Sequence, residues 1–202
     1  MYMEDIERFR GTGERNEKGE TLEEFLENYD ARKYDLPANT TDIVVVHKGR
    51  VLLIKRKNHP CIGMWSTPGG FVNFKEDLLD CAKRELYEET GVTGIPLKQM
   101  LTWGRPDLDP RWRIITTPFY ADIDDDVPVK AGDDAKDAAW FDYDIEGNGS
   151  IRTMTLTNDQ GDVLKTVIET KEDGYYYPIE SSGIDGAHAC IVLEALDEIK
   201  KG

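Results

Sequence analysis

Residues 70–92 read GFVNFKEDLLDCAKRELYEETGV, a stretch with the pattern of an amphipathic helix and its C-terminal stop. Gly91 stands where a helix commonly ends, because glycine readily adopts the left-handed conformation that closes the last turn. The pattern predicts a helix over about 77–90. Its apolar residues recur at helical spacing and predict a face turned to a core: Leu78, Leu79, Ala82 and Leu86.

The other face of this predicted helix carries a cluster of carboxylates. Glu85, Glu88 and Glu89 stand at i, i+3 and i+4, where side chains of one helix are neighbours. Like charges at that spacing repel one another and destabilise the helix. A hard divalent cation such as Mg²⁺ would offset the repulsion, because it prefers oxygen ligands. The alternative is a solvated acidic face in a chain that holds 40 Asp and Glu residues.

The whole stretch resembles the signature of the Nudix hydrolase family. That signature is a glycine, five residues, a glutamate, seven residues and then Arg-Glu-aliphatic-X-Glu-Glu-X-Gly-aliphatic. Every fixed position is met, in the order Gly70, Glu76, Arg84, Glu85, Leu86, Glu88, Glu89, Gly91 and Val92. The resemblance also covers the order of predicted elements from about 40 to 145 and the closing helix.

The resemblance implies an α/β/α sandwich with a mixed β-sheet, and an enzyme that cleaves a nucleoside diphosphate linked to another group. It implies Mg²⁺ as cofactor, with Mn²⁺ as the alternative, and Arg84 and Glu76 as residues that orient the ligands. The implied metal ligands are Glu85, Glu88, Glu89 and the backbone carbonyl of Gly69. Water activated by the metal and a carboxylate would attack phosphorus. The base is Glu85 or a later glutamate, the candidates being Glu146, Glu172 and Glu180.

A second segment, 103–113, reads WGRPDLDPRWR. An acidic protein that binds a polyanion needs local cations, and this segment has three arginines beside two tryptophans. It resembles the Gly-X-Pro-X-X-Asp-Pro-Arg-X-Arg segment of the ADP-ribose pyrophosphatase-like branch of Nudix proteins, with Leu108 where that branch usually has arginine. The candidate substrate-binding residues are Trp103, Arg105, Asp109, Arg111 and Arg113. The alternative is an ordinary loop and strand start, with the tryptophans packed in a core or at its rim.

The rest of the chain reads as strands separated by turn-rich loops. Two apolar runs, 42–47 and 50–55, flank Lys48-Gly49 and predict a hairpin. Further strands are predicted at about 97–103, 113–123 and 138–143, a second hairpin at 151–157 and 163–170, and a closing helix at about 182–200. The predicted fold class is therefore α/β (α+β), with one central helix and one closing helix.

We expect two parts in the chain. Residues 1–40 form an N-terminal segment with a short helix at about 21–31, where Thr21 and Glu24 fit a capping box, behind a loosely held stretch at 1–20. Residues 41–202 form the Nudix-type domain, with an inserted hairpin at 147–170. That insertion is read as surface, with a lid over the site or a dimer arm as the alternatives.

Composition excludes several classes of protein. The 25 Lys and Arg residues against 40 Asp and Glu give a net charge of −15, which disfavours a nucleic-acid or membrane-surface binder. No apolar run approaches the roughly 20 residues that span a bilayer. Three cysteines without a CxxC pair indicate reduced thiols. We expect a cytoplasmic protein whose partner is a small-molecule nucleotide, with no nucleic acid and no membrane; a homodimer is left open.

The resulting hypothesis is a Mg²⁺-dependent pyrophosphohydrolase that converts ADP-ribose to AMP and ribose 5-phosphate. One alternative keeps this chemistry but takes nucleoside triphosphates or other sugar nucleotides. Another is a nucleotide-sensing regulator or binding module on a Nudix scaffold, a class that usually has an eroded signature and a C-terminal winged helix. The intact signature and the lack of a basic cluster in residues 144–202 favour the enzyme.

Overall fold

The computed structural model describes residues 5–132 and 135–201, and the chain divides into two compact units, Met1–Leu36 and Pro37–Gly202. In the first unit, helix α1 (Leu22–Asn28) begins with the predicted capping box, since Thr21 accepts from the Glu24 N–H and the Glu24 carboxylate accepts from the Thr21 N–H. The helix ends earlier than predicted because Tyr29 is extended. Short 3₁₀ turns flank it: η1 (Glu7–Phe9) and η2 (Ala31–Lys33). Residues 1–4 of the expected loose terminus lie outside the described residues.

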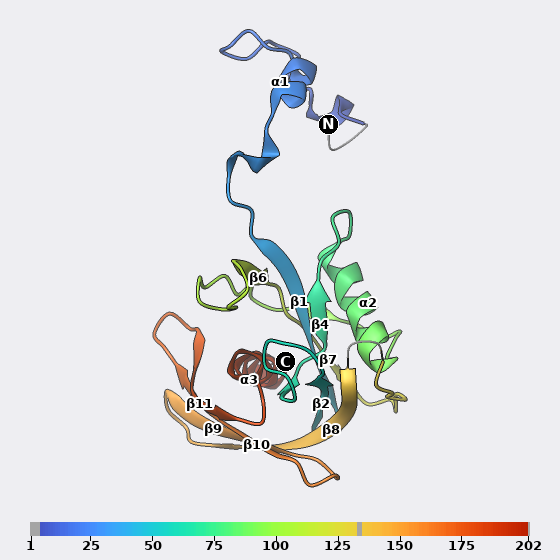
Figure 1. The fold of residues 1–202 in the computed structure, drawn as a ribbon, viewed down its shortest axis with the longest axis vertical. Helices are drawn as coiled ribbons and strands as arrows, with labels where there is room; N and C mark the ends of the chain where they lie inside the picture. The colour runs from blue at the N-terminus through green and yellow to red at the C-terminus, as the bar shows by residue number, and fades with distance from the viewer. Residues whose placement is uncertain (1–4, 133–134, 202) are drawn as a thin grey trace. The chain divides into compact units, whose positions relative to one another are not determined.

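The second unit is a mixed sheet with two helices (Figure 1). The helices are α2 (Leu78–Thr90) and α3 (Gly186–Lys201). The strands are β1 (Ala38–His47), β2 (Arg50–Arg56), β3 (Trp65–Ser66), β4 (Gly69–Phe71), β5 (Lys98–Gln99), β6 (Ile114–Thr116), β7 (Phe119–Ile123), β8 (Ala135–Glu146), β9 (Ile151–Thr157), β10 (Val163–Thr170) and β11 (Tyr176–Ser182). The main order is β11-β10-β9-β8-β2-β1-β7-β5. Strand β1 runs parallel to β6 and β7, whereas the other pairs are antiparallel, so the sheet is mixed as expected.

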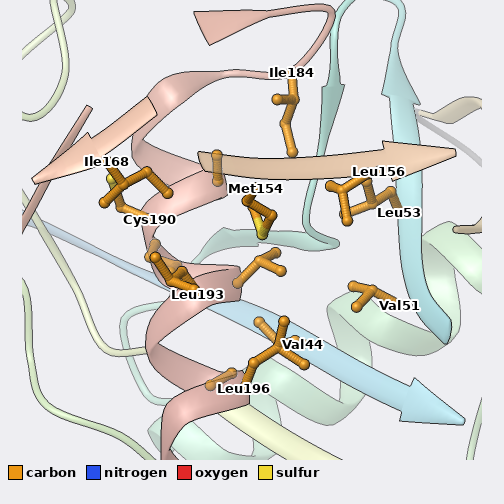
Figure 2. Packing of buried hydrophobic residues seen from close by; sticks show 14 of the residues in the cluster. Val44, Val51, Leu53, Met154, Leu156, Ile168, Ile184, Cys190, Leu193 and Leu196 are labelled. Carbon is orange, nitrogen blue, oxygen red and sulfur yellow. The ribbon is translucent and has the colours of Figure 1, made fainter. Parts of the chain in front are cut away.

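Strand β1 separates two apolar cores, because successive side chains of a strand point to opposite faces. Ile43 and Val45 pack with residues of α2, whereas Val44 and Val46 pack with residues of α3. The two helices lie on opposite sides of the sheet around β1, as Figure 1 shows. Figure 2 shows the larger core, in which α3 packs against β1, β2, β9 and β10. This arrangement confirms the sandwich.

Two predicted strands are interrupted. The predicted strand at 113–123 is two strands, β6 and β7, which pair in parallel with successive parts of β1. The break falls at Thr117-Pro118, where proline has no N–H to donate to a ladder. The predicted strand at 97–103 is reduced to β5 and a bridge between Trp103 and Thr116.

The predicted second hairpin forms as β9 and β10, and it continues the main sheet from β8. Its inward residues belong to the core under α3, among them Leu164 and Ile168, which are almost fully buried. The hairpin is therefore part of the sheet. The closing helix begins at Gly186, later than predicted, because Ser182 still belongs to the edge strand β11.

No helix in the described ranges, 5–132 and 135–201, is both long enough and apolar enough to cross a bilayer.

Candidate active site

The register of α2 sets the direction of each signature residue. The Asp77 side chain caps the helix by accepting from the Leu79 N–H, and Gly91 ends it in the left-handed conformation at φ 72°. Leu86 then faces the core, Glu88 is exposed, and Glu85 is mostly buried, with 14% of its side chain exposed. The local sequence alone determines this arrangement, because both helix ends are specified by their caps.

Glu89 is buried, with 7% of its surface exposed, and it contacts the first residue of β4. Its Oε2 accepts a hydrogen bond of 2.8 Å from the Gly69 N–H. The contact joins α2 to the short strand that pairs with β1. The carboxylate of Glu89 and the Gly69 backbone, both predicted to serve the metal, are therefore brought together.

Arg84 holds the other signature carboxylates. It donates to both oxygens of Glu76, to Glu85 Oε1 at 2.6 Å and to Glu88 Oε2 at 3.0 Å. A further bond from Nη2 reaches the Phe71 carbonyl at 3.1 Å. One guanidinium thus gathers three carboxylates, which is the orienting arrangement predicted for Arg84 and Glu76.

Charge and burial act differently on these carboxyl groups. Hydrogen bonding from Arg84 lowers the pKa of Glu76 to about 2, so that Glu76 is ionised at neutral pH. Burial raises the pKa of Glu85, and the bond from Arg84 opposes that shift only in part. Glu85 therefore has a greater tendency than Glu76 to take up a proton.

Gly70 lies against the Glu85 carboxyl group. An ideal Cβ at this position would lie 2.5 Å from Glu85 Cδ and Oε1, closer than real Cβ atoms approach. Glycine is therefore required for the carboxylate to occupy this place beside β4.

The donor set fits a hard divalent cation, since it consists of carboxylate oxygens beside a glycine turn. Glu85, Glu88 and Glu89 could hold such an ion together with the Gly69 backbone. In the arrangement described for residues 5–132 and 135–201, no three His, Cys, Asp or Glu side chains already converge as a metal site. Two of these carboxylates face Arg84 and the third faces the Gly69 N–H, so binding would require short movements of their carboxyl groups.

A cavity of about 540 Å³ connects the signature to the Asp-Pro-Arg loop. The signature side of its lining comprises Gly69, Gly70, Arg84, Glu85 and Glu89. The loop side comprises Leu108, Asp109, Pro110 and Arg111. Two segments that are separate in the chain, and that are predicted from separate patterns, therefore line one cavity.

Arg111 and Asp109 form an ion pair on this wall. Arg111 Nη2 donates to Asp109 Oδ2 at 2.8 Å, and the Arg111 N–H donates to Asp109 Oδ1 at 2.8 Å. The hydrogen bonds from Arg111 lower the pKa of Asp109. The guanidinium also lies 5.2 Å from the ring centroid of Phe71, which lines the cavity.

Three predicted substrate-binding residues do not line the cavity. Trp103 is 1% exposed, and its indole N–H donates to the buried Glu194 at 2.7 Å. Arg105 stacks over the Tyr177 ring at 4.2 Å, and Arg113 donates to the Gly104 and Arg105 carbonyls. Trp103 packs in the core, as in the alternative interpretation, and does not line the cavity.

The cavity lining also contains residues that the sequence patterns did not single out as ligand-binding. Among them are Arg56 at the end of β2, Lys57, Asn58, His59, Pro60 and Cys61 of the loop that follows, and Asp185, Ala187 and His188 at the start of α3. The only sequence signal for the loop is the Arg56-Lys57 pair that follows a predicted strand. The candidate bases Glu146, Glu172 and Glu180, and the predicted ligand Glu88, are not among the lining residues.

Comparison with known proteins agrees with this geometry. The profile of the NUDIX domain family matches residues 37–163. An ADP-ribose pyrophosphatase of Methanocaldococcus jannaschii is 41% identical over 122 residues, covering 58% of this chain and 70% of that protein. A MutT/nudix family protein from Enterococcus faecalis superposes with a TM-score of 0.72 at 31% identity, covering 90% of this chain and 70% of the other. The NUDIX domain of Shewanella oneidensis NrtR, solved in complex with ADP ribose, superposes with a TM-score of 0.56 at 30% identity, covering 60% of this chain and 82% of that one.

The fold and the carboxylate cluster define a hydrolase of the α/β/α sandwich class. The chain belongs to the Nudix family, and it is a Nudix hydrolase with relatives among ADP-ribose pyrophosphatases.

Proposed function

We propose that this Nudix hydrolase is a Mg²⁺-dependent pyrophosphohydrolase that converts ADP-ribose and water to AMP and ribose 5-phosphate. The observation that carries the proposal is the single cavity shared by Glu85, Glu89 and Arg111. A substrate with a central diphosphate and a group on each side needs a long hollow with carboxylates for a metal and cations for phosphate. The names of the archaeal relative and of the NrtR complex support the same ligand class.

The proposed roles follow the geometry. Glu85, Glu88, Glu89 and the Gly69 carbonyl would hold the metal, which supplies Lewis-acid activation of water and of the diphosphate when bound. Arg84 and Glu76 keep these carboxylates in place through the bonds described above. Mn²⁺, with similar oxygen preferences, is the alternative ion.

Glu85 is the proposed base. It lines the cavity together with Glu89 of the same signature. It would accept a proton from the water that attacks one phosphorus, while the bond between that phosphorus and the bridging oxygen breaks. The electron pair of the broken bond stays with the bridging oxygen, which leaves as part of one phosphate monoester. The attacked phosphorus keeps the oxygen of the water and belongs to the other phosphate monoester. Arg111 would neutralise charge on the diphosphate, since guanidinium groups match phosphate oxygens.

Two alternatives differ in substrate or class. Nucleoside triphosphates or other sugar nucleotides would use the same carboxylates but need not contact Arg111. A nucleotide-sensing module would bind without turnover, and the complete signature disfavours it. We propose that the partner of this protein is a small-molecule nucleotide, and not a nucleic acid or a membrane. The cytoplasmic location stays a prediction, and a homodimer is left open.

The test is a substrate panel with the purified full chain and either Mg²⁺ or Mn²⁺, with products identified by mass spectrometry. We expect AMP and ribose 5-phosphate from ADP-ribose, at a higher kcat/KM than for nucleoside triphosphates. Preference for triphosphates would contradict the substrate and keep the chemistry. Binding of ADP-ribose without turnover by either metal would replace the enzyme with the sensing module.

A further inference from the structure

A buried polar cluster borders the cavity and takes no part in the roles proposed above. Asp42 of β1 is its centre. Asp42 Oδ1 accepts from Thr67 Oγ1 at 3.2 Å and lies 3.2 Å from His188 Nδ1, while Oδ2 accepts from Thr116 Oγ1 at 2.5 Å. His188 Nδ1 also lies 2.7 Å from Thr67 Oγ1. Three residues distant from it in the sequence, Thr67, Thr116 and His188, thus enclose the carboxylate of Asp42.

The pattern of donors determines which ring nitrogen of His188 is committed to the cluster. An ionised carboxylate can only accept, and Asp42 Oδ1 lies 3.2 Å from Nδ1. Nδ1 therefore carries a proton and donates inward. Among residues 5–132 and 135–201, no hydrogen bond involves Nε2, and His188 lines the cavity with 18% of its side chain exposed. Nε2 is the nitrogen left to meet a ligand.

The electrostatic surroundings favour a charged imidazolium. Burial opposes the charged form of His188, but the carboxylates of Asp42 and Asp185 outweigh burial and raise its pKa. Burial likewise opposes ionisation of Asp42, and His188, Thr116 and Thr67 outweigh it and keep the pKa of Asp42 low. Arg56 is the neighbouring cation that acts against protonation of His188.

The cluster lies next to the signature. Asp42 pairs with Gly69 in the ladder between β1 and β4, and an ideal Cβ on Gly69 would lie 3.0 Å from Asp42 Oδ1. The Gly69 N–H donates to Glu89. His188 therefore approaches the same carboxylate of Asp42 that adjoins Gly69, a proposed metal ligand.

We propose that His188 is a substrate-binding residue: its Nε2–H donates to a phosphate oxygen of the diphosphate, and Asp42 and Thr67 hold the ring through Nδ1. The inference rests on the proposed function for the identity of the substrate, and it assigns to α3 a direct contact with that substrate. The signature end of the cavity carries several carboxylates that repel phosphate, so a donor that lines the same cavity has a clear electrostatic use.

Two variants separate substrate contact from support of the fold. In His188→Asn the side-chain amide can replace Nδ1 toward Asp42 and Thr67 but does not reach the position of Nε2. In His188→Gln the longer amide can reach the Nε2 position but not replace Nδ1 as well. We expect His188→Asn to weaken binding of α,β-methylene ADP-ribose, measured by calorimetry, about tenfold or more, because a bond to a charged phosphate is lost. His188→Gln should retain more affinity than His188→Asn.

The same measurements can overturn the inference. Unchanged affinity in His188→Asn, or a greater loss in His188→Gln together with a lower Tm, would show that the residue serves only the internal cluster. The proposed function is tested separately by wild-type turnover of ADP-ribose. If the wild-type protein prefers a nucleoside triphosphate, the KM values of His188→Asn and His188→Gln are compared for that substrate instead. The inference then stands or falls independently of ADP-ribose.

Discussion

Arg84 and Glu76 are joined by two parallel hydrogen bonds, from Nε to Oε1 at 2.7 Å and from Nη2 to Oε2 at 2.8 Å. This fork leaves Nη1 to contact Glu85 and Glu88. Glu76 precedes α2 and Arg84 lies within it, so the pair attaches the loop after β4 to the helix. The position of the proposed metal ligands depends on this attachment.

Substitution of Glu76 should therefore reduce turnover without removing a metal ligand. In Glu76→Gln we expect kcat to fall about tenfold to a hundredfold, the range typical of residues that orient metal ligands. Steady-state kinetics over a range of Mg²⁺ concentrations would measure it. Glu7→Gln is a matched control, since it removes an exposed ion pair with Arg10 in the first unit. An unchanged kcat in Glu76→Gln would show that Arg84 keeps its position without the two hydrogen bonds to the Glu76 carboxylate.

The space at Gly70 gives a second prediction. Gly70→Ala should displace the Glu85 carboxyl group, because the added Cβ would lie 2.5 Å from it. A displacement of about 1 Å can cost about a hundredfold in rate, so we expect kcat to fall by roughly that factor. Gly149→Ala is the control, as its Cβ would meet nothing within 4 Å. Equal kcat values in Gly70→Ala and Gly149→Ala would show that turnover does not depend on the position of the Glu85 carboxyl group.

The carboxylates themselves should be sensitive to loss of charge. Glu89→Gln keeps an oxygen that can accept from the Gly69 N–H, and Glu88→Gln keeps an acceptor for Arg84, so the fold should persist. We expect turnover to fall by orders of magnitude in both, with weaker binding of Mn²⁺ by calorimetry. Glu198→Gln, on the surface of α3, should leave both quantities unchanged. Near-normal activity at limiting Mg²⁺ would contradict the metal assignment.

Arg111 should discriminate between substrates. Arg111→Ala should raise KM for ADP-ribose about tenfold, the cost of one hydrogen bond to a charged group, and should raise KM for a nucleoside triphosphate less. Lys98→Ala removes a cation outside the cavity lining and serves as the control. Equal increases in KM for both substrates would show that Arg111 does not discriminate between them.

The pair of Trp103 and Glu194 predicts a dependence of stability on pH. Burial raises the pKa of Glu194, so the folded state binds a proton more tightly than the unfolded state does. The contribution of Glu194 to stability then falls as pH rises above about 4.5, its ordinary value, toward the raised folded pKa. Urea unfolding from pH 4 to pH 8 should show the stability of Glu194→Gln rising relative to wild type. A constant difference across this range would contradict the prediction.

Trp103→Phe tests the same pair from the other side. Loss of the indole N–H leaves a buried carboxylate without its donor, which should cost about 1–3 kcal/mol of unfolding free energy. KM for ADP-ribose should not change, because Trp103 does not line the cavity. An increase in KM with unchanged stability would restore Trp103 as a substrate-binding residue.

Helix α2 and the carboxylates it presents could be predicted from the sequence because each depends on neighbours within one helix. The cap at Asp77, the stop at Gly91 and the spacing of Glu85, Glu88 and Glu89 are local features. The hairpin of β1 and β2 was predictable for the same reason, since its turn lies between two adjacent runs. The family resemblance extended this local information to the sandwich.

Tertiary structure decided which distant residues share the cavity. Trp103 and Arg111 are eight residues apart in one motif, yet only Arg111 lines the cavity, because the bridge to Thr116 and the bond to Glu194 bury Trp103. His188 lies 146 residues after Asp42 and meets it only because α3 packs across β1. Residue type and spacing specify local conformation, but a contact between remote segments depends on how sheet and helices pack. The sequence by itself therefore determined the family and the carboxylate cluster, and the packing of the sheet and its two helices determined the shape and the cationic and histidine lining of the site.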